Sequence, residues 1–197
     1  MSGRLAILIP AAGASRRMGG RDKLLEAVAD GRSLLRDRIA VARATGLPVL
    51  VALPPRAIAP ERWRHAEGAT RVEIAPWPCG MGDSLAALVS AISEPVAGAL
   101  ILPADMPDID TADLNKMMQS FDSSAIFRGV SAAGIAGHPV VFPRSMFSAL
   151  GKLTGDKGGH ALLENAQIRH IPLPSTHATT DLDTPEAWAK WRAAQVR

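Results

Sequence analysis

The chain has 197 residues, 47% of them hydrophobic and 21% charged, which is the balance of a globular protein and argues against extended disorder. Its length fits one domain covering residues 1–197, and no apolar run reaches the length of a membrane span. The formal net charge of +3 suits small anionic ligands, whereas the absence of tyrosine and the scattered Phe and Trp argue against nucleic-acid binding.

The chain opens with an apolar strand that runs into a loop of small residues and cations. Ala11, Ala12 and Gly13 follow the strand, and four cations then lie within eight residues, the last of them Lys23. Small residues let backbone N–H groups approach phosphate oxygens, and cations neutralise phosphate charge. The loop therefore predicts a polyphosphate site, although its spacing matches neither the P-loop nor the dinucleotide-binding pattern.

Two simpler interpretations of this start remain open. An apolar stretch of this length that ends in Ala-Ala-Gly also fits a secretory signal, although Arg16 and Arg17 follow it at once. A buried first strand with a solvated basic turn would need no ligand at all.

Further along the chain, apolar strands alternate with helices, which indicates a mainly parallel sheet covered by helices on both faces. In such sheets ligands bind beyond the carboxyl ends of the strands. Strands are expected at 49–53, 72–75, 97–102, 125–127, 139–142 and 169–173, and helices at 33–45, 80–92, 111–120, from 145, at 161–165 and from 185.

Asp105 is the strongest candidate for a metal ligand, because it follows the apolar strand 97–102 between small and rigid residues. Mg²⁺ prefers hard oxygen ligands and commonly takes one or two carboxylates together with phosphates and water. An aspartate that bonds its own backbone in a tight turn is the structural alternative.

The opening loop resembles the signature of the MobA-like nucleotidyltransferases in its Ala11-Ala12-Gly13 step, in Ser15-Arg16-Arg17-Met18-Gly19 and in Lys23. The Ala-Ala-Gly version is similar to the branch that cytidylylates molybdenum cofactor, whereas the guanylyltransferase branch carries Gly-Gly. The segments 80–85, 137–140, 154–159 and 181–186 also match in order, so the resemblance covers nearly the whole chain. Pro10 and Met106 depart from the family's usual Leu and Gln.

The resemblance implies a three-layer α/β/α fold with a Rossmann-like sheet of the nucleotide-diphospho-sugar-transferase type. It also implies Mg²⁺-dependent transfer of CMP from CTP to the terminal phosphate of molybdopterin, with release of pyrophosphate. Asp105 and Asp183 would hold the metal, with Asp181 as the alternative to Asp183. Capping of the terminal helix is an ordinary role for Asp183 as well, and the two roles can coexist.

The resemblance further assigns individual residues. Arg17, Lys23 and Asp105 would be catalytic, and His138 and Asp156 would bind the acceptor, unless His138 merely fixes a Gly-His-Pro turn. The nucleotide would be bound by Ala11, Ala12, Gly13, Ser15, Arg17, Lys23, Gly82 and Ser84.

Alternatives to this function also remain open. The same chemistry could use GTP, or a sugar phosphate or other phosphorylated acceptor, and a non-catalytic nucleotide-binding protein could keep the same loop. The expected partners are CTP, a phosphorylated pterin and a molybdoenzyme or its maturation chaperone, with neither nucleic acid nor membrane. The single cysteine, Cys79, excludes an internal disulfide and favours a reducing compartment, by default the cytoplasm.

Overall fold

The computed structural model describes residues 4–28, 30–164 and 166–195, and its centre is a seven-stranded sheet. The strands are β1 (Leu5–Pro10), β2 (Val49–Leu53), β3 (Thr70–Glu73), β4 (Gly98–Ile101), β5 (Ile126–Val130), β6 (Ala136–Pro143) and β7 (Ile168–Pro172). They lie in the order β3-β2-β1-β4-β6-β5-β7, and only β6 runs against its neighbours. The predicted mainly parallel sheet is confirmed.

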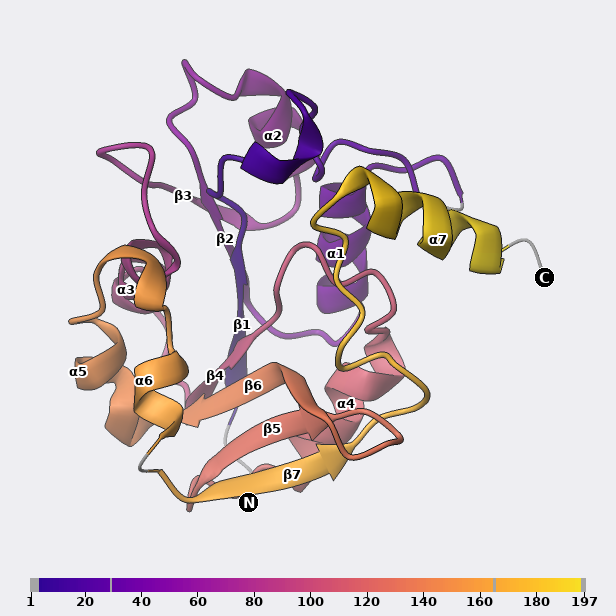
Figure 1. The fold of residues 1–197 in the computed structure, drawn as a ribbon. Helices are drawn as coiled ribbons and strands as arrows, with labels where there is room; N and C mark the ends of the chain where they lie inside the picture. The colour runs from indigo at the N-terminus through magenta and orange to yellow at the C-terminus, as the bar shows by residue number, and fades with distance from the viewer. Residues whose placement is uncertain (1–3, 29, 165, 196–197) are drawn as a thin grey trace.

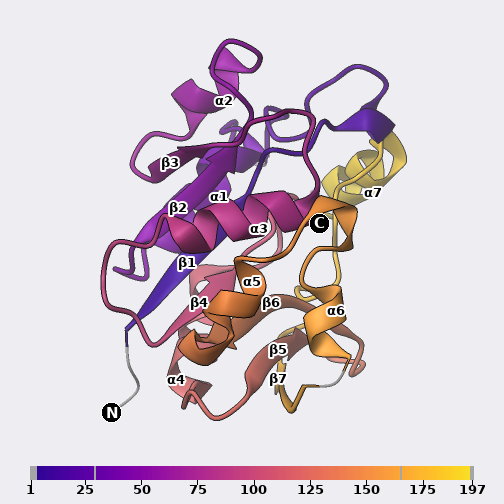
Figure 2. The ribbon, with the colours of Figure 1, turned by 90° about the vertical axis from the view of Figure 1, so that its left-hand side faces the viewer.

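Helices cover both faces of this sheet and complete a three-layer α/β/α fold (Figures 1 and 2). One face carries α1 (Leu34–Arg43), α2 (Pro60–His65), α4 (Thr111–Ser120) and α7 (Pro185–Gln195). The other face carries α3 (Met81–Ser90), α5 (Phe147–Leu150) and α6 (His160–Leu163). Short 3₁₀ turns, η1 (Arg16–Met18), η2 (Arg144–Met146) and η3 (Gly155–Lys157), lie in the connections. None of the described helices has the length and apolar character that crossing a bilayer needs.

Alternation along the central strands fills two hydrophobic cores. In β1, Ile7 and Ile9 face the core under α1 and α4, whereas Leu8 faces the core under α3. All six residues of β1 are buried, since β2 and β4 flank the strand and helices cover both its faces. This central position gives the loop that follows β1 a rigid support.

The structure departs from the expected elements in two places. Helix α2 lies in a polar, proline-containing segment that carries no helical period, and it was not expected. Strands β5 and β6 pair with each other and extend into the expected connection. Gly129 allows this close pairing, since a Cβ built on it would lie 2.6 Å from the His138 carbonyl. His138 therefore lies within β6 rather than in a turn. The last residue of the helix expected at 161–165 lies outside the described residues.

The topology gathers the loops of interest at one edge of the sheet. The segments after β1, β4 and β7 leave the carboxyl ends of parallel strands, and β6, running the opposite way, begins at the same edge. Arg38 of α1, 3% exposed, supports the segment after β4 by donating to the carbonyls of Met106, at 2.8 Å, and Ile109. Asp105 is thereby held at this edge.

Candidate active site

A lysine ammonium joins the two predicted metal-binding carboxylates. Lys23 Nζ lies 2.6 Å from Asp105 Oδ2 and 2.5 Å from Asp183 Oδ1. The three side chains come from the loop after β1, the segment after β4 and the segment before α7. The Leu182 N–H donates to the Asp105 carbonyl at 2.9 Å, which ties the last two segments together. Residues 82 and 160 positions apart thus meet at one point.

Electrostatics around this point favour cations. Burial opposes the charge of Lys23, but the adjacent Asp105 and Asp183 carboxylates outweigh burial and raise the pKa of Lys23. Burial likewise opposes the charge of Asp183, but Lys23 and Arg17 lower the pKa of this carboxyl. Arg17 reaches it at 2.5 Å while staying 71% exposed, so its guanidinium can also meet a ligand.

The three carboxylates have the chemistry that a hard divalent cation requires. Burial, followed by the charges of Asp183 and Asp105, raises the pKa of Asp181, against the effect of Lys23 and Arg17. A divalent ion would relieve this repulsion through carboxylate oxygens, its preferred ligands. The residues present therefore fit Mg²⁺ or Mn²⁺.

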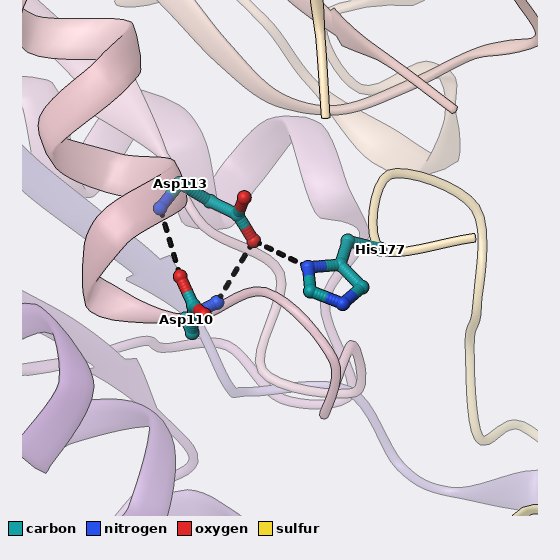
Figure 3. A group of neighbouring side chains, drawn as sticks. All are labelled: Asp110, Asp113 and His177. Carbon is teal, nitrogen blue, oxygen red and sulfur yellow. Dashed lines mark hydrogen bonds and ion pairs between the residues drawn. The ribbon is translucent and has the colours of Figure 1, made fainter. Parts of the chain in front are cut away.

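A second acidic group, formed by Asp110, Asp113 and His177, has a structural explanation (Figure 3). Asp110 and Asp113 form the capping box of α4, with N–H to carboxylate distances of 2.8 and 3.1 Å. His177 Nδ1 lies 2.7 Å from Asp113 Oδ2. This contact fastens the segment 173–183 to α4, and thus helps to place Asp183.

Most of the predicted nucleotide-binding residues line one cavity of about 400 Å³. Its walls come from the loop after β1, the start of α3 and the segment after β4. The predicted residues among its walls are Ala11, Ala12, Gly13, Ser15, Arg17, Lys23 and Ser84.

Gly82, in contrast, lies outside this wall and serves packing. It is buried in the first turn of α3, and a Cβ built on it would stand 2.9 Å from the backbone of Thr154. The glycine lets the segment before η3 approach α3. The structure thus brings every predicted nucleotide-binding residue except Gly82 to the cavity.

A neighbouring cavity of about 380 Å³ contains both predicted acceptor residues, His138 and Asp156. Asp105, Asp156 and Asp183 line both cavities, so the two spaces meet at the carboxylates. Apolar side chains, among them Leu85, Val140 and Phe142, form much of the second wall. We refer to the two spaces as the nucleotide cavity and the acceptor cavity.

His138 enters the acceptor cavity in its neutral form. Burial, and then the neighbouring Arg128 guanidinium, lower the pKa of His138 to about 4, against the opposite effect of Asp105. Its Nδ1 is enclosed and has no hydrogen-bond partner among the described residues. A neutral imidazole cannot hold an anion by charge, whereas Arg128, which also lines this cavity, carries a positive charge.

Sequence reasoning missed two arginines of the site. Arg128 lies on β5 and donates from Nε to the Gly137 carbonyl at 3.0 Å, which leaves the rest of its guanidinium for the cavity. Arg62 lies on α2 and binds the loop after β1. Neither belongs to a local motif, so only the tertiary structure could reveal them.

Comparisons with known proteins place the chain among nucleotidyltransferases. The family model described as MobA-like NTP transferase domain matches residues 7–171. The structure of an Rv0371c homologue from Mycobacterium sp. strain JC1 is 26% identical, with 98% of both chains covered and a TM-score of 0.83. Rv0371c of Mycobacterium tuberculosis H37Rv, in complex with manganese, is 24% identical over 97% of this chain and 99% of that one, with a TM-score of 0.80.

A third similar structure, more distant in sequence, is a CMP:2-keto-3-deoxy-manno-octonic acid synthetase in complex with CTP. It is 17% identical over 98% of each chain, with a TM-score of 0.72. Curated proteins give no match to the sequence.

Alanine in place of Gly13 should affect NTP binding, whereas alanine in place of Gly82 should affect stability. Nothing lies within 4 Å of a Cβ built on Gly13, so Gly13→Ala should change the free energy of unfolding by less than about 0.5 kcal/mol. The added methyl group should instead block close approach of a nucleotide and weaken NTP binding about tenfold or more. Gly82→Ala should lower the free energy of unfolding by about 1–3 kcal/mol, the cost of overpacking. Denaturant unfolding and calorimetric titration with NTP measure both effects, and equal losses of stability would contradict this division.

Proposed function

Because the chain belongs to the MobA-like NTP transferase family, we propose that it transfers CMP from CTP to the terminal phosphate of molybdopterin, releasing pyrophosphate. The observation that carries this proposal is the meeting of two cavities at the cluster of Lys23, Asp105 and Asp183. A nucleotide on one side and a phosphorylated acceptor on the other would bring their phosphates to the same charged point.

The reaction needs alignment and charge neutralisation more than covalent participation by the protein. An oxygen of the acceptor phosphate bonds to the α-phosphorus, and the bond from that phosphorus to the oxygen leading to the β-phosphate breaks. Pyrophosphate leaves with the electron pair. Lys23 and Arg17 stabilise the charge that moves onto the leaving group, in a site where water is partly excluded.

Asp105 and Asp183, with Asp181 beside them, are the residues that would hold Mg²⁺. When bound, the ion would supply positive charge between two anionic substrates and orient their oxygens. The manganese complex of the fold neighbour Rv0371c supports a divalent metal in this architecture.

The acceptor cavity suits a molecule with a flat, largely uncharged body and an anionic end. Leu85, Val140 and Phe142 offer apolar contact, neutral His138 offers a hydrogen bond, and Arg128 offers a positive charge. A phosphorylated pterin has these features. Its cytidylylated product would pass to a molybdoenzyme or to the chaperone that matures one.

Pyrophosphate release measured with each NTP and each class of acceptor tests the proposed function. With Mg²⁺ present, CTP and molybdopterin together should release pyrophosphate, and omission of the acceptor should abolish the signal. Faster release with GTP, or with a sugar phosphate as acceptor, would replace the proposed substrates. Saturable NTP binding without release from any acceptor would identify a non-catalytic nucleotide-binding protein.

Lys23→Ala should lower kcat by about 10²–10³, the effect of removing one electrostatic stabiliser of the transition state. Lys190→Ala, on the outer helix α7, makes the same change of charge and should leave kcat unchanged. Steady-state pyrophosphate assays of both variants provide the comparison. A Lys23→Ala enzyme within about threefold of the wild type would remove Lys23 from the mechanism.

Metal binding should distinguish the two acidic groups. Asp105→Asn should weaken Mn²⁺ binding at least about tenfold, because a carboxylate ligand is lost. Asp110→Asn should leave Mn²⁺ binding unchanged and the protein folded, since Asn caps a helix as well as Asp does. Electron paramagnetic resonance of free Mn²⁺, recorded with CTP present, measures both affinities. Loss of binding in Asp110→Asn alone would move the metal to the group with Asp113 and His177.

A further inference from the structure

One buried guanidinium organises the loop that lines the nucleotide cavity. Arg62 is 3% exposed, and its Nη1 donates to the carbonyls of Ala11 and Gly13, each at 2.7 Å. Its Nε and Nη2 bind the two carboxylate oxygens of Asp22 at 2.6 and 2.7 Å. Nη2 also lies 3.2 Å from the Ser15 hydroxyl, so a single side chain fastens both ends of the loop.

Trp77 completes the same arrangement. Its indole Nε1 donates to the Ala12 carbonyl at 2.8 Å, so the carbonyls of residues 11, 12 and 13 each accept a hydrogen bond from a side chain of the protein and are turned toward that side chain. The backbone N–H groups of Ala12, Gly13 and Ala14 have no acceptor among the described residues. Ala12 is only 1% exposed, and a buried N–H without an acceptor is rare in a native protein. The loop therefore offers hydrogen-bond donors, and not acceptors, to a ligand.

We propose that Arg62, together with Trp77, is a positioning residue that selects the nucleotide base. The inference rests on the proposed function and adds the cause of its base preference. On its pairing edge cytosine presents two adjacent acceptors, O2 and N3, beside one amino group, and the two acceptors match a loop of donors. Guanine presents N1–H and an amino group, and uracil presents N3–H, so each would meet an N–H where it needs a carbonyl. A mismatch of this kind leaves polar groups unpaired and discriminates strongly.

Arg62 acts through the loop and not by touching the nucleotide, since it does not line the cavity. Lysine in its place would keep the charge opposite Asp22 but could not bind two carboxylate oxygens and two carbonyls at once. In Arg62→Lys the carbonyls of Ala11 and Gly13 become free to turn and accept from a base. Base preference, and not only stability, should then change.

Direct titration of CTP, UTP and GTP into the wild type, Arg62→Lys and Trp77→Phe tests the inference. We expect the wild type to prefer CTP, and each variant to lose about tenfold of its CTP-to-GTP affinity ratio. Trp77→Phe removes the indole donor and keeps an aromatic ring at this position, so it serves even where Arg62→Lys unfolds. Arg71→Lys is the matched control, because Arg71 also donates to a carbonyl, that of Trp63, at 3.1 Å, yet lies outside the cavity.

Steady-state kinetics separate positioning from a purely structural role. In Arg62→Lys, KM for CTP should rise about tenfold while kcat at saturating CTP stays within about threefold of the wild type. A structural defect would lower kcat for every nucleotide equally and leave KM unchanged. If the wild type prefers CTP and neither variant changes this base preference, the positioning role of Arg62 would be overturned and the proposed function would stand. A wild type that binds no NTP would overturn the proposed function itself.

Discussion

The ion pairs of Lys23 with Asp105 and Asp183 are the interaction on which the rest of the site depends. Two carboxylates brought this close repel each other unless a cation lies between them, and the buried ammonium supplies that charge within the chain. The loop after β1, the segment after β4 and the segment before α7 are held together by it.

The sheet explains why these segments meet. Parallel strands put their carboxyl ends at one edge, and the central position of β1 surrounds its loop with the ends of β2 and β4. The secondary supports come from helices on the same face: Arg38 of α1 holds the segment after β4, and Arg62 of α2 holds the loop after β1. Buried arginines suit this work because one planar guanidinium binds several oxygens at fixed angles.

Much of the fold and part of the site could be predicted from local patterns. Strands β1, β2 and β4 are apolar runs, α1 begins at the capping residue Ser33, and α4 matches the expected 111–120. Asp105 was predictable because it follows such a strand, whereas Lys23 and Asp183 were predicted from the resemblance to the MobA-like family. Arg62 was not, because it lies 51 residues from the Ala11 carbonyl that it binds, on a helix with no periodic signal. Arg128 and the strand position of His138 depend on the pairing of β5 with β6, which short apolar runs do not determine.

The reversed direction of β6 gives the two cavities different walls. The segments at the ends of β1 and β4 line the nucleotide cavity. The acceptor cavity is also lined by Val140 and Phe142 of β6, which runs in the opposite direction, and by Arg128 of the neighbouring strand β5. The carboxylates of Asp105, Asp156 and Asp183 are the charged groups common to both spaces. Substitutions in β5, β6 and α6 can therefore reshape the acceptor cavity, while the loop after β1, with its own supports, keeps the nucleotide cavity intact.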